Sequence, residues 1–116
     1  MIIRNFLSAE LVQVSGIHDG VGTALHKTLY GPKDFTTNLR FINYTILPAG
    51  ATIGLHTHGD DEEIYIVLEG SGEMTANGEV RQVKTGDLIV NPPFGTHGLV
   101  NNTKEEIRLM VIGIGK

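Results

Sequence analysis

Glycine divides this chain into short segments, and this spacing limits the folds open to it. The 116 residues include 15 glycines, and the stretches between them are rich in Val, Ile, Leu, Thr and Tyr, which favour strands. No stretch sustains an apolar repeat of 3.6 residues, so we expect little helix. The segments that predict strands are residues 23–29, 39–47, 53–56, 64–69, 72–76, 79–82, 87–91, 97–101 and 107–112. Short strands separated by turn signals predict an all-β sandwich, jelly roll or barrel.

Length and composition narrow the function. A chain of 116 residues predicts a single domain over residues 1–116. The net charge of −4, without a basic run, argues against nucleic acid and anionic membranes as partners, so we expect a small-molecule ligand or substrate. No cysteine is present, which leaves any metal site to His and carboxylates. The N-terminus lacks a secretory apolar region, and no apolar run approaches about 18 residues, so we expect a soluble, cytoplasmic protein.

The first stretch that could bind a metal ion contains two histidines and an acidic pair. His56 and His58 alternate along a predicted strand, so their side chains share one face, with α-carbons about 6.5–7 Å apart. Two imidazoles placed in this way can converge on one metal ion. Residues 59–61 then turn the chain, so that Glu62 or Glu63 on the next strand can return a carboxylate to the same point.

A lone histidine ends the second stretch. Residues 86–101 contain a turn rich in proline and glycine, which delivers His97 to the start of a strand. This is a plausible route for a fourth ligand from a distant part of the chain.

Both stretches resemble the two motifs of the cupin superfamily, in particular its small single-domain members. The first motif, over residues 50–70, is matched by Gly50, His56, His58, Glu63 and Gly70, and this spacing selects Glu63 over Glu62. The second, over residues 86–101, is matched by Gly86, Pro92, His97 and Asn101. One departure is Phe94, which stands where the family usually has glycine and puts the local turn conformation in question.

The resemblance implies a double-stranded β-helix, the cupin jelly-roll barrel. It also implies one divalent transition metal ion per chain (Mn, Fe, Ni, Co, Cu or Zn), held by His56, His58, Glu63 and His97, and a homodimer. The segment from Ile64 to Leu68 is apolar on both faces, which agrees with a barrel interior on one side and a cover, such as a partner subunit, on the other.

Other residues are assigned by position. Tyr65 and Val67 share the parity of Glu63, so we expect them to line the cavity and bind a ligand or cofactor there. We expect the acidic turn of residues 60–62 to stay in water, and His18 and His26 to lie at the surface or a subunit contact. Asn43 and its neighbours Arg40 and Tyr44 are left unassigned, because strand parity cannot place all three inside.

The metal site permits several functions. The first hypothesis is a small metalloenzyme of the oxygenase, decarboxylase, isomerase or lyase type, acting on an oxygen-rich molecule such as a carboxylate or sugar derivative. The alternative is a non-catalytic, metal-dependent binding or sensor module, and a third is a purely structural metal. The sequence identifies no general acid or base, and the fold alone cannot decide among these functions.

Overall fold

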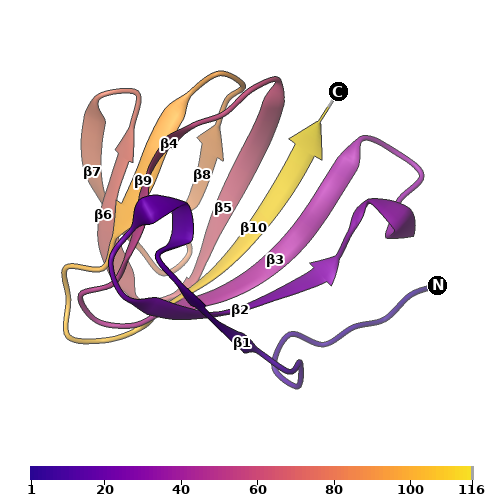
Figure 1. Ribbon diagram of the computed structural model, residues 1–116, viewed down its shortest axis with the longest axis horizontal. Helices are drawn as coiled ribbons and strands as arrows, with labels where there is room; N and C mark the ends of the chain where they lie inside the picture. Colours follow the sequence, from indigo (N-terminus) through magenta and orange to yellow (C-terminus); the bar gives the residue numbers. More distant parts are fainter. Residues whose placement is uncertain (116) are drawn as a thin grey trace.

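Two antiparallel sheets face each other and form a barrel (Figure 1) in the computed structural model, which describes residues 1–115. The six-stranded sheet has the order β1 (Val12–Ser15), β2 (Thr23–Tyr30), β3 (Leu39–Leu47), β10 (Ile107–Gly115), β5 (Asp61–Glu69) and β8 (Leu88–Asn91). The four-stranded sheet has the order β4 (Thr52–Thr57), β9 (Thr96–Val100), β6 (Ser71–Ala76) and β7 (Glu79–Lys84). The all-β prediction is confirmed.

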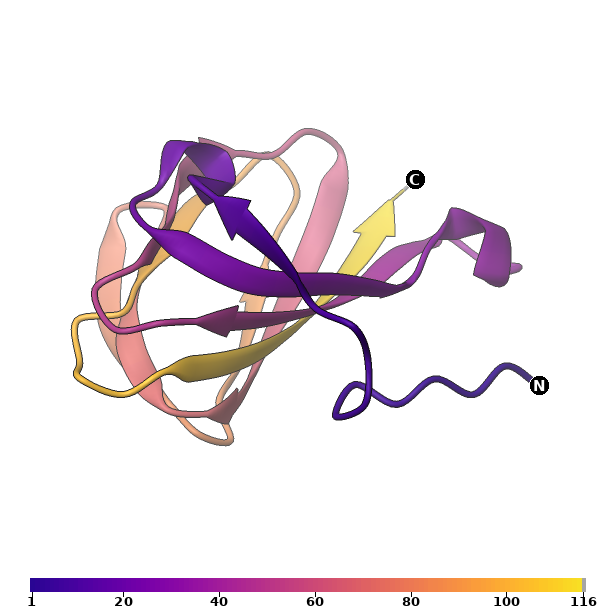
Figure 2. The same ribbon diagram turned by 60° about the horizontal axis from the view of Figure 1, so that its bottom comes forward.

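Within residues 1–115, helix is limited to two single turns, as expected. They are the 3₁₀ turns η1 (Ile17–Asp19) and η2 (Pro32–Asp34). Among residues 1–115, no helix is long and apolar enough to cross a membrane. Figure 2 shows η1 folded over one end of the barrel, close to β4.

Every predicted strand is present, with ends that shift by a few residues. The one strand that the sequence analysis missed is β1, which has four residues with mostly exposed side chains. In the described part of the chain it pairs with β2 alone, at the edge of the sheet. An exposed edge strand needs no buried face, so it leaves little hydrophobic alternation to detect.

The core lies between the two sheets. Along β5, Glu63, Tyr65 and Val67 are buried, whereas the residues between them are only partly covered. β10 alternates in the same way, with Leu109 fully buried at its centre. Because side chains alternate along a strand, the polar Glu63 is carried into the barrel by the same periodicity that builds the core.

The outer face of the six-stranded sheet is partly covered by the chain itself. The ring centroids of Phe6 and Tyr44 lie 4.9 Å apart. Tyr44 and Leu29 belong to a second apolar cluster outside the barrel. The N-terminal segment supplies part of this cover, and Leu68 of β5 packs against the same cluster.

Candidate metal centre and its cavity

Three histidines and one glutamate converge inside the barrel. The potential ligand atoms of His56, His58, Glu63 and His97 all lie within 4.8 Å of one another. Glu63 Oε1 lies 3.1 Å from His97 Nε2 and 3.2 Å from His58 Nε2. The structure therefore brings together the four residues that the sequence analysis selected as metal ligands.

Strand register places these groups. His56 on β4 is directly opposite His97 on β9. The next strand along the chain, β5, belongs to the other sheet and brings Glu63 to the same site. His58 lies one residue beyond β4, where its backbone N–H donates to the carbonyl of Gly95 at 2.9 Å. The end of β4 is thus tied to the loop that carries His97.

The turn before His97 is kept despite Phe94. Its φ of 61° lies in the left-handed region that glycine favours, and its backbone N–H donates to Gly59 at 2.8 Å. The side chain is 67% exposed, so the bulky ring meets no packing conflict. The departure from the motif therefore leaves the position of His97 intact.

Hydrogen bonds orient two of the rings. His56 Nδ1 lies 2.7 Å from the carbonyl oxygen of Gly54, and His58 Nδ1 lies 2.9 Å from the carboxylate of Asp61. Because both partners are acceptors, each Nδ1 donates, and each Nε2 keeps its lone pair for the centre of the cluster. Asp61 thereby corrects the expectation that the whole acidic turn stays in water.

Unpaired polar atoms gather at this site. His56 Nε2, His58 Nε2 and His97 Nδ1 are buried without a hydrogen-bond partner, since His58 Nε2 is close to Glu63 but poorly aligned with it. The other such atoms in residues 1–115 belong to Asn91, directly opposite Glu63, and to Asn43. Buried polar groups are rarely left unsatisfied, and a His₃Glu donor set fits a divalent transition metal.

Burial shifts the protonation of the site. It lowers the pKa of His56, with the nearby histidines acting in the same direction, so the imidazole favours its neutral, metal-binding form. Burial also raises the pKa of Tyr65 far above its ordinary value, and the Glu63 carboxylate adds to the shift. Tyr65 therefore stays protonated at neutral pH and can donate a hydrogen bond.

His18 belongs to this site, contrary to the surface position expected from the sequence. Its ring stacks on His56 with centroids 3.6 Å apart and planes 9° from parallel. The turn η1 can approach β4 this closely because Gly54 has no side chain. A Cβ at this position would collide with the carbonyl oxygen of His18. No local sequence signal connects His18 with a strand some 35 residues later.

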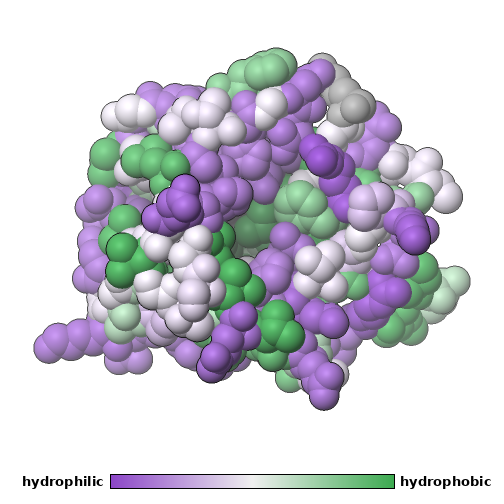
Figure 3. All heavy atoms as spheres, viewed as in Figure 1, coloured by the Kyte–Doolittle hydropathy of each residue, from purple (hydrophilic) through white to green (hydrophobic). Residues whose placement is uncertain are grey.

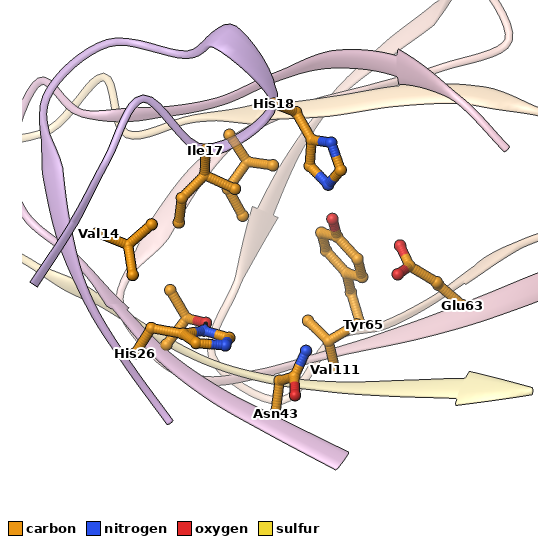
Figure 4. A pocket seen from close by; sticks show the side chains of 10 residues that line it. Val14, Ile17, His18, His26, Asn43, Glu63, Tyr65 and Val111 are labelled. Carbon is orange, nitrogen blue, oxygen red and sulfur yellow. Dashed lines mark hydrogen bonds between the residues drawn. The ribbon is translucent and has the colours of Figure 1, made fainter. Parts of the chain in front are cut away.

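A cavity of about 250 Å³ adjoins the cluster. Its polar lining comes from His18, His26, Asn43, Thr45, Glu63 and Tyr65, and its apolar lining from Val14, Ile17, Ile53 and Val111. Figure 3 shows a hollow in one face of the molecule with hydrophobic residues in its floor. Figure 4 shows the lining side chains pointing toward the shared space.

The cavity revises two assignments. Tyr65 lines it, but Val67 does not and lies in the core, only 1% exposed. Two residues along a strand move a side chain about 6.5–7 Å, which carries Val67 past the end of the cavity. His26, expected at the surface or a subunit contact, lines the cavity instead.

The comparisons with known proteins agree with this architecture. A family model described as "Cupin domain" matches residues 43–113. An uncharacterized protein of Methanocaldococcus jannaschii is 46% identical over 87% of this chain and 80% of its own length. The oxalate-binding protein of Thermotoga maritima is 25% identical over 97% of this chain and 92% of its own length.

Solved structures show the same barrel. A protein of Thermotoga maritima described as a predicted oxalate decarboxylase superimposes with a TM-score of 0.94, at 24% identity and with full coverage of both chains. The polyketide cyclase RemF of Streptomyces resistomycificus gives a TM-score of 0.78 at 20% identity, covering 100% of this chain and 80% of that one. These similarities confirm the double-stranded β-helix.

Proposed function

This chain belongs to the cupin family, and we propose that it uses one divalent transition metal ion to bind and transform a small, oxygen-rich carboxylate. His56, His58, Glu63 and His97 would hold the ion. The observation that carries the proposal is the convergence of three imidazoles on the Glu63 carboxylate beside an open cavity, with the buried Nε2 atoms of His56 and His58 left unpaired. A divalent ion at that point supplies a Lewis acid for a chelated carboxylate or carbonyl group.

Charge favours an anionic ligand. Three neutral imidazoles and one carboxylate leave a divalent centre with a net charge near +1. Among the residues of the described range 1–115 that line the cavity, Glu63 is the only carboxylate, and no lysine or arginine is present. The sequence similarity to an oxalate-binding protein supports the same class of ligand.

Binding without turnover is the second candidate. Apart from Glu63, the protic side chains lining the cavity are His18, His26, Asn43, Thr45 and Tyr65. Tyr65 is held protonated by burial, so it suits orientation of a ligand better than proton abstraction. A chain with these groups can hold a chelating acid without converting it.

One experiment separates these candidates. The purified protein is stripped with a chelator, reloaded with Mn²⁺, Co²⁺ or Zn²⁺, and titrated calorimetrically with oxalate and lactate. ¹³C NMR of the same mixtures then follows the acid over time. Saturable, metal-dependent binding supports the proposal, and new carbon resonances identify an enzyme. No binding of either acid to metal-loaded protein would overturn it.

We also propose a cytoplasmic homodimer, with the partner covering the outer face of β5. Ile64 and Ile66 point outward there and are only partly buried. A specific interface is expected to bury at least about 1,000 Å² in total. Light scattering at micromolar concentration should give twice the chain mass, and a monomer mass would contradict the proposal.

A further inference from the structure

We propose that His26 and Asn43 form a second anchor in the cavity, which selects an acid longer than oxalate with a neutral oxygen group at its far end. This inference rests on the proposed function, because it assumes that the first anchor is the metal centre. The ligand class that it specifies is a hydroxylated monocarboxylate.

The second anchor lies across the six-stranded sheet from the metal centre. Asn43 on β3 is in register with Val111 on β10, which is in register with Tyr65 on β5. Two strand spacings separate β3 from β5, about 9.5 Å between backbones. His26 lies one strand further away, on β2, opposite Thr45. Figure 4 shows His26 on the side of the cavity away from Glu63 and His18.

The polar atoms of this anchor are incompletely used. Among residues 1–115, the Asn43 side chain has no hydrogen-bond partner, and its buried Oδ1 is left unpaired. His26 Nδ1 lies 2.9 Å from the hydroxyl oxygen of Thr45, which leaves Nε2 available. Figure 4 shows the Asn43 side chain at the cavity wall with its amide nitrogen directed into the cavity and its oxygen directed away from it. An amide and an imidazole that share an apolar wall with Val111 can bind a ligand hydroxyl or carbonyl.

Charge makes a neutral group the better fit at the far end. Within residues 1–115, no lysine or arginine lines the cavity, and burial lowers the pKa of His26, which favours its neutral form at pH 7. A second carboxylate placed there would lose its hydration without gaining a cation. A hydroxyl or carbonyl would instead exchange water for two protein hydrogen bonds.

Size agrees with this choice. The cavity volume of about 250 Å³ lies just below the usual range for drug-sized ligands, about 300–1,000 Å³. A two-carbon acid held at the metal centre would leave the His26 and Asn43 side chains facing water. An acid of about four carbons is long enough for its chain to extend along the apolar wall toward them.

The test compares acids with a shared chelating end. Metal-loaded protein is titrated with lactate, which has only the chelating end, with threonate and erythronate, which add hydroxyls, and with malate, which adds a carboxylate. We expect threonate or erythronate to bind at least about tenfold more tightly than lactate and malate. Equal affinity for all four acids, or a preference for malate, would overturn the inference.

Two variants locate the effect. Asn43→Leu and His26→Leu should each remove most of the advantage of the hydroxylated acid and leave lactate and metal affinity within about twofold. Asn102→Leu, at an exposed asparagine, is the matched control. Circular dichroism and metal stoichiometry establish that each variant is folded. Equal losses for lactate and threonate would contradict a separate anchor.

If lactate and oxalate also fail to bind wild-type protein that holds metal, the proposed function fails as well.

Discussion

The two ends of β9 carry buried polar side chains that differ in how completely they are hydrogen-bonded. Asn101, just beyond the strand, is fully buried and fully paired, since its Nδ2 donates to the carbonyls of Leu47 and Glu105 and its Oδ1 accepts from Thr103. His97, near the start, is equally buried, but its Nδ1 has no partner. A satisfied polar group stabilises the fold, whereas the cluster that His97 joins through Nε2 also holds the unpaired Nε2 atoms of His56 and His58, which indicates a missing ligand.

Removing a ligand at the unpaired end should give the largest effect. His97→Ala deletes one imidazole of the cluster, so we expect metal affinity to fall more than about 100-fold, beyond the 10–100-fold typical of outer-shell partners. The core should remain, because the apolar cluster between the sheets does not need this side chain. Calorimetric metal titration measures the loss, and circular dichroism checks the fold. Stoichiometric metal held at wild-type affinity would refute the site.

Removing the paired end should reverse the pattern. Asn101→Ala leaves the carbonyls of Leu47 and Glu105 unsatisfied, so the free energy of unfolding should fall by about 2–3 kcal/mol. Metal bound per folded chain should not change. Urea denaturation followed by metal analysis tests both statements. A folded variant that has lost its metal would show that the two ends of β9 are not independent.

Asp61 should have an intermediate effect on metal binding. Asp61→Asn weakens the hydrogen bond that orients His58, so we expect metal affinity to fall about tenfold. Asp60→Asn is the matched control, because Asp60 is exposed on the same turn. Identical affinities for the two variants would mean that Asp61 does not position His58.

The smallest effect is expected from the stacked pair. His18→Ala removes the ring that lies on His56, so metal affinity should fall about two- to fivefold. His18→Phe keeps an aromatic face and should restore most of the loss. If phenylalanine fails to restore affinity while alanine weakens it, His18 acts through its nitrogen atoms and not through stacking.

The candidate ligands could be predicted from the sequence because short-range spacing encodes them. His56 and His58 alternate on one strand, and the intervals to Glu63 and His97 match the two cupin motifs. The strands themselves were also predictable, because Gly-bounded, β-prone segments reflect local backbone preferences.

Only the tertiary structure placed the residues around the ligands. His18 meets His56 through the close approach of η1 to Gly54, and His26 and Asn43 reach the cavity through the register of β2, β3 and β10. Val67 shares the parity of Tyr65 but lies outside the cavity, because parity sets the face of a strand and not the depth along it. Spacing along the chain determines which side chains share a face, whereas sheet order and register determine which of them share a cavity.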